Sequence, residues 1–462
     1  MKKSLVLWVV VMVSGQVGAQ QPLAADRALA REILKEFVEI RSTQEDGTAR
    51  AAQAVVARLA AAGFPKEDLQ IVTSDGNVAN VVARFRGRNP AVPGVLLMAH
   101  IDVVPARRED WSMDPWTLLE RDGWLYGRGS TDNKAGVAML VANFVTLKRA
   151  GWQPARNLII VLTGDEETAQ KGIQALLQKH RPLLDAALAF NTDGGGVRLI
   201  DGRPAVFEVQ ASEKIYADYQ LEATDVGGHS SLVRPDNPIY TLAAALTRIG
   251  EHQFPLHVSD VTRMFLQRSA TIESGQTAVD MRTVAAAPPD QAAAARLSRT
   301  PYFNAQLRTT CVATTVQAGH ANNALPQLAR AVVNCRILPG LPGADVEAVI
   351  RKLAGDKVKV TVIEPPVVSP PSTPTSALLS RIERLAAKQW PGIPVIPVMA
   401  TGATDGMYTR SSGIPTFGVS AVDSNPDDDR AHGKDERIGV ESFYKATQFW
   451  FELMKESGDD TH

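Results

Sequence analysis

The sequence predicts an α/β protein, in which helices cover both faces of a mixed, mostly parallel sheet and a smaller α+β domain is inserted. Short, wholly apolar runs predict the strands of that sheet, because strands buried on both faces lack polar alternation. These runs are 95–98, 158–162 and 186–190, and segments of helical periodicity, 136–149 and 172–180, lie between them. Such alternation of strand and helix is typical of parallel sheets that are covered on both sides.

Two amphipathic helices are expected between residues 26 and 62, before the first strand, because their apolar residues recur at helical spacing. Near Ala211 the pattern changes, and 215–223 alternates polar and apolar residues like a half-exposed antiparallel strand. A helix at 238–249, strands at 309–317 and 328–338, and a helix at 344–353 complete a small antiparallel sheet with helices on one face.

The order of these patterns predicts that one domain is inserted into another. The Pro-rich segment 365–371 is the expected return linker, after which a helix at 377–389 resumes the first pattern. We therefore expect a large domain formed by residues 20–211 and 367–462, and an inserted lid domain formed by residues 212–366.

Composition limits the classes of function. The chain has 462 residues, 45% of them hydrophobic, which is enough for a large core and for more than one domain. Its 49 basic and 50 acidic residues give a formal net charge of -1, which argues against a general binder of nucleic acid or of anionic membranes. Two cysteines are too few for a disulfide scaffold or a cysteine-based zinc module, so a metal site must use histidines and carboxylates.

Residues 1–19 have the features of a signal peptide. Lys2 and Lys3 precede an apolar run, and the segment ends in small residues at Ala19. The run is well short of the about 20 residues that a membrane span needs, so an uncleaved anchor is the weaker alternative. We expect cleavage after Ala19, a mature protein outside the membrane, and export to an oxidising compartment such as the bacterial periplasm, with secretion as the alternative.

Ionisable residues follow the carboxyl ends of the three predicted strands. The first strand is followed by His100 and Asp102, the second by 165–167 and the third by Asp193. Ligands of open α/β sheets bind at this edge. Charged groups beside buried strands are costly unless they are paired or bind a metal, so the three endings together favour a site.

Two further residues offer the same ligand chemistry. Asp132 lies in a glycine-rich loop, 127–134, and His432 lies in a polar segment near the carboxyl terminus. Imidazole and carboxylate together suit zinc, and a shared carboxylate can bridge two ions ~3.5–4 Å apart. Each residue alone also has an ordinary structural explanation: Asp132 suits a helix N-cap, and His432 suits a loop. Their joint occurrence with the strand endings favours a metal site.

Four motifs occur here in the order and spacing of a known zinc metallopeptidase family. They are Met98–Pro105, Gly127–Lys134, Thr163–Glu167 and Asn191–Asp193. From about residue 27 to its end, the chain resembles the family that includes glutamate carboxypeptidase, aminoacylase, carnosinase and succinyl-diaminopimelate desuccinylase. The resemblance implies a fold of the dinuclear zinc exopeptidase type.

The resemblance also implies a role for each residue of the site. His100 and Asp193 would bind one zinc, Glu167 and His432 the other, and Asp132 would bridge both. Glu166 would be the general base toward a metal-activated water, and Asp102 would orient His100. Two zinc ions per chain are therefore expected, with Co²⁺ or Mn²⁺ as alternatives.

The inserted domain carries motifs that are similar to those of the family at 227–230, 322–326 and 334–336. By analogy, His229 would help to stabilise the oxyanion, in relatives often from the neighbouring subunit, so a homodimer through the lid domain is also expected. Asn323 and Arg336 would hold the carboxylate of the substrate, for which a planar guanidinium is well suited.

The expected function is hydrolysis of an amide bond next to a free carboxylate, in a small peptide or an N-acyl amino acid. Carboxypeptidase, dipeptidase and N-acyl-amino-acid hydrolase all remain open, because they differ in the shape of the substrate pocket. The alternative from another class is a catalytically silent zinc-binding or peptide-binding protein of the same fold. A serine hydrolase is not supported, since the strand-to-helix turns lack a Gly-x-Ser-x-Gly motif.

Cys311 and Cys335 lie equally far from a turn centred near Asn323, in two consecutive predicted strands. In one register they face each other and form a disulfide. A slip of one residue turns the side chains to opposite faces of the sheet, so two separate thiols are the equal alternative.

Overall fold

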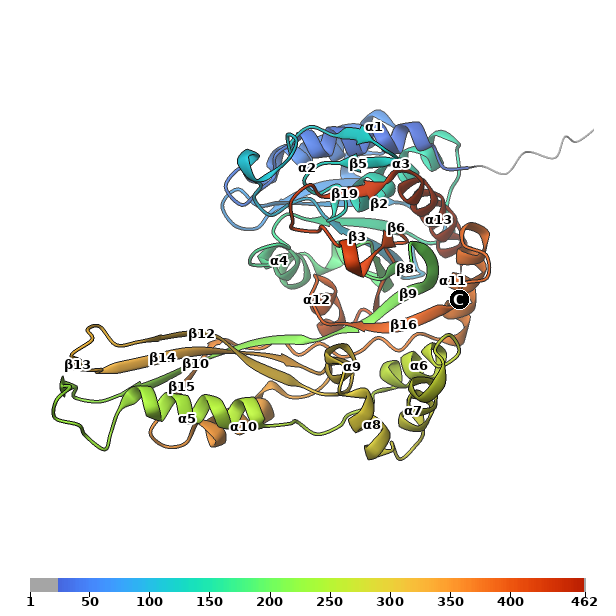
Figure 1. Ribbon diagram of the computed structural model, residues 1–462. Helices are drawn as coiled ribbons and strands as arrows, with labels where there is room; N and C mark the ends of the chain where they lie inside the picture. Colours follow the sequence, from blue (N-terminus) through green and yellow to red (C-terminus); the bar gives the residue numbers. More distant parts are fainter. Residues whose placement is uncertain (1–23, 461–462) are drawn as a thin grey trace, which may run out of the picture.

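The computed structural model describes residues 24–460, and the predicted signal peptide lies outside the described residues. The three predicted strands are neighbours in one large sheet, as β6 (Leu158–Thr163), β3 (Gly94–His100) and β7 (Ala186–Asn191) (Figure 1). β3 is parallel to both neighbours, so the three carboxyl ends lie at one edge of the sheet.

The large sheet has ten strands in the described part of the chain and is mixed. β6 is followed outward by β2 (Ala79–Phe85) and β1 (Leu69–Thr73), which are antiparallel. On the other side β7 is followed by these strands, in order: β17 (Thr416–Gly418), β9 (Arg203–Glu213), β8 (Gly196–Ile200) and β18 (Asp423–Ser424). β16 (Val395–Ala400) also pairs with β9 and is parallel to it.

Alternate residues of the central strands pack on opposite faces of the sheet, as the apolar runs predict. Leu97 belongs to the core under five helices: α1 (Arg27–Glu39), α2 (Ala49–Ala61), α3 (Lys134–Arg149), α11 (Ser376–Gln389) and α13 (Val440–Asp459). Leu96 and Met98 belong to the core on the other face, where α4 (Lys171–Lys179) contributes Ile173, and α12 (Gly406–Ser411) lies beside α4. Full burial of such a side chain contributes about 1.5–3 kcal/mol, which explains why these runs carry no polar residue.

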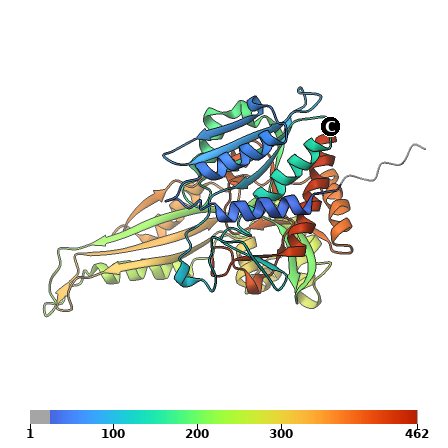
Figure 2. The ribbon, with the colours of Figure 1, turned by 90° about the horizontal axis from the view of Figure 1, so that it is seen from above.

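The inserted lid domain contains a four-stranded antiparallel sheet that extends away from the large sheet (Figures 1 and 2). Its strands, in spatial order, are β12 (Thr310–Ala318), β14 (Leu328–Ile337), β10 (Ile215–Thr224) and β15 (Lys359–Glu364). Two helices, α5 (Pro238–Glu251) and α10 (Gly343–Ala354), cover one face. A two-residue pair, β11 (Gly228–His229) with β13 (Ala324–Leu325), forms the far tip of the domain.

The two cysteines face each other in the register of β12 and β14, and a disulfide joins Cys311 to Cys335. Of the two alternatives that the sequence left open, the structure therefore has the paired one. The bond fastens the edge strand β12 to the strand that carries Arg336.

The segment 260–307 lies within the residues predicted for the lid domain, 212–366. It forms four helices: α6 (Asp260–Ser269), α7 (Gly275–Ala285), α8 (Gln291–Leu297) and α9 (Pro301–Leu307). Leu266 of α6 packs with Val206 of β9 and with Ile396 of β16, both in the large sheet. The range expected for the lid domain, residues 212–366, therefore includes a helical segment whose apolar residues pack against the large sheet.

A separate three-stranded sheet lies beside the large one. It is formed by β4 (Leu119–Arg121), β5 (Trp124–Tyr126) and β19 (Arg437–Gly439). Its pairing of β5 with β19 brings the loop of Asp132 next to the carboxyl-terminal segment of His432. None of the helices within residues 24–460 is long and apolar enough to cross a membrane.

Candidate active site

The predicted ligands come together where the parallel strands end. His100 is the last residue of β3, Asp193 follows β7 by two residues, and Glu166 and Glu167 follow β6. Asp132 lies in the loop before α3, and His432 lies before β19. The site is therefore assembled from loops at one edge of the sheet, as the positions of the polar residues predict.

One carboxylate lies between the two histidines. Nε2 of His100 is 2.9 Å from Oδ1 of Asp132, and Nε2 of His432 is 3.1 Å from Oδ2 of the same side chain. Nε2 of His432 is also 2.8 Å from Oε2 of Glu167. Each oxygen of the Asp132 carboxylate faces one imidazole. A carboxylate that bridges two metal ions requires this arrangement, because each of its oxygens binds a different ion.

Two groups of side chains in the described chain have ligand atoms close enough to hold a metal ion. In one group, atoms of His100, Asp132 and Glu167 all lie within 4.8 Å of one another, and in the other, atoms of His100, Glu166 and Asp193 do. Oε1 of Glu167 is buried without a hydrogen-bond partner in the described chain. The donor set of imidazoles and carboxylates fits a divalent metal, and the orphaned oxygen is available as a ligand atom.

The electrostatics of the site favour a bound cation. Burial, and next the charge of Asp132, raise the pKa of Asp193 to about 7. Burial, followed by the charge of Asp193, raises the pKa of Glu166 well above its usual value. Hydrogen bonds to Asp132 and Glu167 raise the pKa of His432 to about 10. Crowded, buried carboxylates cost free energy that a divalent ion offsets.

Asp102 connects the end of β3 to the turn after β6. Nδ1 of His100 lies 3.1 Å from the backbone oxygen of Asp102 and 3.4 Å from its Oδ1. The carboxylate of Asp102 accepts hydrogen bonds from the backbone N–H groups of Glu166 and Glu167, at 3.2 Å and 3.0 Å. A donor bond from Nδ1 leaves Nε2 of His100 free to act as a ligand.

Sequence reasoning missed Gln170, whose Nε2 donates to Oε1 of Glu166 at 3.0 Å. Gln170 lies just before α4 in a left-handed conformation, with φ of 50°. Asp165, beside the predicted base, instead accepts the backbone N–H groups of Lys171 and Gly172, so it caps the start of α4. Four-residue spacing from Glu166 was the only sequence signal for Gln170.

The lid residues lie apart from this cluster. His229 is exposed and belongs to β11, which pairs with β13 at the far tip of the lid domain (Figure 1). Asn323 lies next to it, and its backbone oxygen accepts a hydrogen bond from the backbone N–H of Ser230 at 3.1 Å. Arg336 lies near the other end of β14, with its guanidinium 4.7 Å from the ring centre of Tyr216. Within residues 24–460, no hydrogen bond or ion pair connects His229, Asn323 or Arg336 to the predicted metal ligands.

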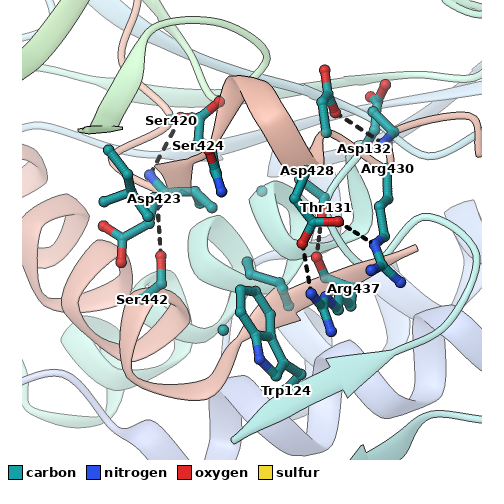
Figure 3. A pocket seen from close by; sticks show the side chains of 18 of the residues that line it. Trp124, Thr131, Asp132, Ser420, Asp423, Ser424, Asp428, Arg430, Arg437 and Ser442 are labelled. Carbon is teal, nitrogen blue, oxygen red and sulfur yellow. Dashed lines mark hydrogen bonds and ion pairs between the residues drawn. The ribbon is translucent and has the colours of Figure 1, made fainter. Parts of the chain in front are cut away.

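A cavity of about 810 Å³ opens beside Asp132 and Asp193. Apolar side chains of its wall include Met139, Leu199 and Ile438. Figure 3 shows the polar part of the wall, in which Asp428 accepts from both Arg430 and Arg437, at 2.7 Å and 2.6 Å. Its volume is in the range that holds a small organic molecule.

A mixed α/β sheet with an inserted lid domain, and histidines and carboxylates gathered at its strand ends, define the class of metal-dependent hydrolases. The model of peptidase family M20/M25/M40 matches residues 96–456. The chain therefore belongs to this family of metallopeptidases and related hydrolases, and it is an enzyme of that kind.

Individual relatives agree with this assignment. The chain is 30% identical over 391 residues to human N-fatty-acyl-amino acid synthase/hydrolase PM20D1, which covers 81% of this chain and 76% of the relative. It is 27% identical to the probable carboxypeptidase S-like 2 of Dictyostelium discoideum, over 81% of this chain and 74% of that one. The fold is similar to the M20 family metallo-carboxypeptidase Sso-CP2 from Sulfolobus solfataricus, with a TM-score of 0.69, 18% identity, and 93% and 99% of the two chains covered.

Proposed function

We propose that this protein hydrolyses an amide bond beside a free carboxylate, in a small peptide or an N-acyl amino acid, with the help of two divalent metal ions. The observation that carries the proposal is the position of Asp132, whose two oxygens face His100 and His432. The names of the relatives support both substrate classes, an N-acyl amino acid in one case and a peptide in the other.

We propose zinc as the metal, with Co²⁺ or Mn²⁺ as alternatives. His100 and Asp193 would hold one ion, Glu167 and His432 the other, and Asp132 both. When bound, such ions polarise a carbonyl group and lower the pKa of water. The unpartnered Oε1 of Glu167 and the raised pKa of Asp193 support this set of ligands.

Glu166 is the proposed general base. Gln170 holds Oε1 of Glu166, so the other oxygen is free to take the proton of the attacking water. Glu166 would then donate this proton to the departing amine, which leaves the carboxylate ready for the next cycle. In the metal-free protein, burial, followed by the charge of Asp193, raises the pKa of Glu166, which favours the protonated form that the second step needs.

The lid residues would complete the site from a second subunit. His229 lies at the tip of the lid domain and is exposed, as a residue that enters another subunit must be. The edge strand β12 exposes Val312 to 60% and Val316 to 64%, and an edge with exposed apolar side chains is suited to pairing with another chain. We therefore propose a homodimer formed through the lid domain, with Asn323 and Arg336 as the residues that bind the substrate carboxylate.

We further propose that the protein is exported, with cleavage after Ala19, and that it acts in the periplasm or outside the cell. The disulfide between Cys311 and Cys335 supports an oxidising compartment, because disulfides are rare in reducing ones.

A substrate screen tests the proposed function. The mature protein, residues 20–462, is stripped with a chelator, reloaded with Zn²⁺, and assayed with dipeptides, with N-acyl amino acids and with the amidated form of each. We expect hydrolysis of the free acids by the reloaded protein alone. Binding of these compounds without turnover would instead identify a catalytically silent binding protein.

A further inference from the structure

A buried ion pair joins two segments of the site that are far apart in sequence. Nη1 of Arg128 lies 2.6 Å from Oε2 of Glu436, and the two side chains are only 3% and 1% exposed. Arg128 belongs to the loop of Asp132, and Glu436 follows His432 by four residues. The pair therefore connects the loops that carry two of the proposed metal ligands.

The carboxylate of Glu436 organises the loop of Asp132. Its Oε2 accepts the backbone N–H of Gly129 at 2.9 Å, in addition to the guanidinium of Arg128. Its Oε1 accepts the backbone N–H groups of Thr131 at 2.9 Å and of Asp132 at 3.1 Å. Both oxygens of Glu436 are thus used by this loop, and one of them binds the backbone of Asp132 itself.

The guanidinium of Arg128 fixes the other segment. Its Nη2 donates to the backbone oxygens of His432 at 3.2 Å and of Gly433 at 3.1 Å. His432 has a positive φ of 61°, a conformation that residues other than glycine adopt only when surrounding contacts hold it. Trp111 is 5% exposed, and its ring centre lies 5.1 Å from the guanidinium, so Arg128 is shielded from water.

We propose that Arg128 and Glu436 are positioning residues, which set the distance between the Asp132 carboxylate and the His432 imidazole before a metal ion binds. This inference rests on the proposed function. Without the pair, two irregular loops would have to be ordered by the ion, and the cost of ordering them would be subtracted from its affinity. Groups that orient metal ligands in this way typically change metal affinity or activity by about 10–100-fold.

Titration of metal-free protein with Co²⁺, followed by visible absorption, tests the proposal. For Glu436→Gln we expect the affinity of at least one of the two sites to fall about 10–100-fold. Arg128→Lys keeps the charge but cannot make all three of its bonds, so a smaller loss in the same direction is expected. If Glu436→Gln does not fold, Arg128→Lys carries the test.

The matched control is Asp280→Asn. Asp280 is buried, lies in α7 and forms an ion pair with Arg296, with its carboxylate 2.5 Å from Nη2. The Asp280→Asn substitution therefore also breaks an ion pair, but one that lies away from the site. We expect Asp280→Asn to lower the melting temperature and to leave both Co²⁺ affinities within about twofold of the wild type.

Two other outcomes have distinct meanings. If the Arg128 and Glu436 variants melt earlier but bind Co²⁺ as tightly as the wild type, the pair only stabilises the fold and the inference is overturned. If the wild-type protein itself fails to bind Co²⁺, the proposed function fails, and the positioning role fails with it.

Discussion

Gln170 donates a hydrogen bond of 3.0 Å to Glu166, and this bond fixes the carboxylate at the point where the strand β6 gives way to α4. It leaves one oxygen of Glu166 without a role in the fold. The neighbouring Glu167 points instead at His432, 2.8 Å away. Adjacent glutamates are thus directed to two different partners, and this division can be tested.

Glu166→Gln is expected to retain its metal and to lose about 10²–10⁴-fold in kcat, because the amide cannot accept a proton from water. Glu167→Gln is the matched control, since it makes the same chemical change one residue along but is expected to lose metal. Metal content and kcat of the two variants would be measured side by side. Full activity in Glu166→Gln would remove Glu166 from the role of general base.

Arg336→Ala is expected to lower kcat/KM for substrates with a free carboxylate. The loss corresponds to about 1.5–3 kcal/mol of transition-state stabilisation, the value of a hydrogen bond to a charged group. The kcat/KM of the corresponding amides should stay unchanged. Arg330→Ala, on the same strand, is the control, because Arg330 pairs with Glu222 at 2.8 Å. The measurement is kcat/KM for each acid and its amide. Equal losses for both compounds would show that Arg336 has a structural role.

The disulfide is expected to stabilise the lid domain. It closes a loop with a sequence separation of 24 residues, for which chain entropy predicts about 3 kcal/mol. Reduction should therefore lower the stability of the mature protein, whereas a Cys311→Ser, Cys335→Ser double variant should be insensitive to the reductant. Two free thiols per chain in the denatured, unreduced protein would contradict the pairing.

The folding stability of the metal-free protein is expected to depend on pH because of Asp193. Its pKa is raised from 3.8 to about 7 in the folded state, by burial and by Asp132, so the folded protein holds a proton that the unfolded chain has released. Stability of the metal-free protein should therefore fall as the pH rises from about 4 to about 7. Asp193→Asn should weaken this dependence, as measured by thermal unfolding at a series of pH values. An unchanged slope in that variant would assign the effect to other groups.

The ionisable residues at the strand ends could be predicted from the sequence, because the apolar pattern of a buried strand is a local feature. The run that ends in His100 had to be a strand covered on both faces, and the direction of parallel strands then placed Asp193 beside it. The inserted antiparallel domain was likewise visible in the alternation of 215–223. These features depend on neighbours in sequence and on one rule of topology.

Contacts between segments that are far apart in the sequence could not be predicted from local patterns. The partner of Arg128 is Glu436, and nothing local to either residue indicates the other. No helices were assigned to 260–307 from the sequence, and nothing local shows which sheet this stretch covers. In the structure α6 packs on β16, and α7 packs on α6. The register that joins Cys311 to Cys335 depends on the whole length of β12 and β14, so the sequence left two alternatives.

The metal content of the mature protein, measured together with its activity, tests the central proposal most directly. Elemental analysis of protein purified without chelator should find close to two divalent ions per chain, and activity should disappear on chelation and return on reloading. A metal-free preparation with full activity would contradict the account.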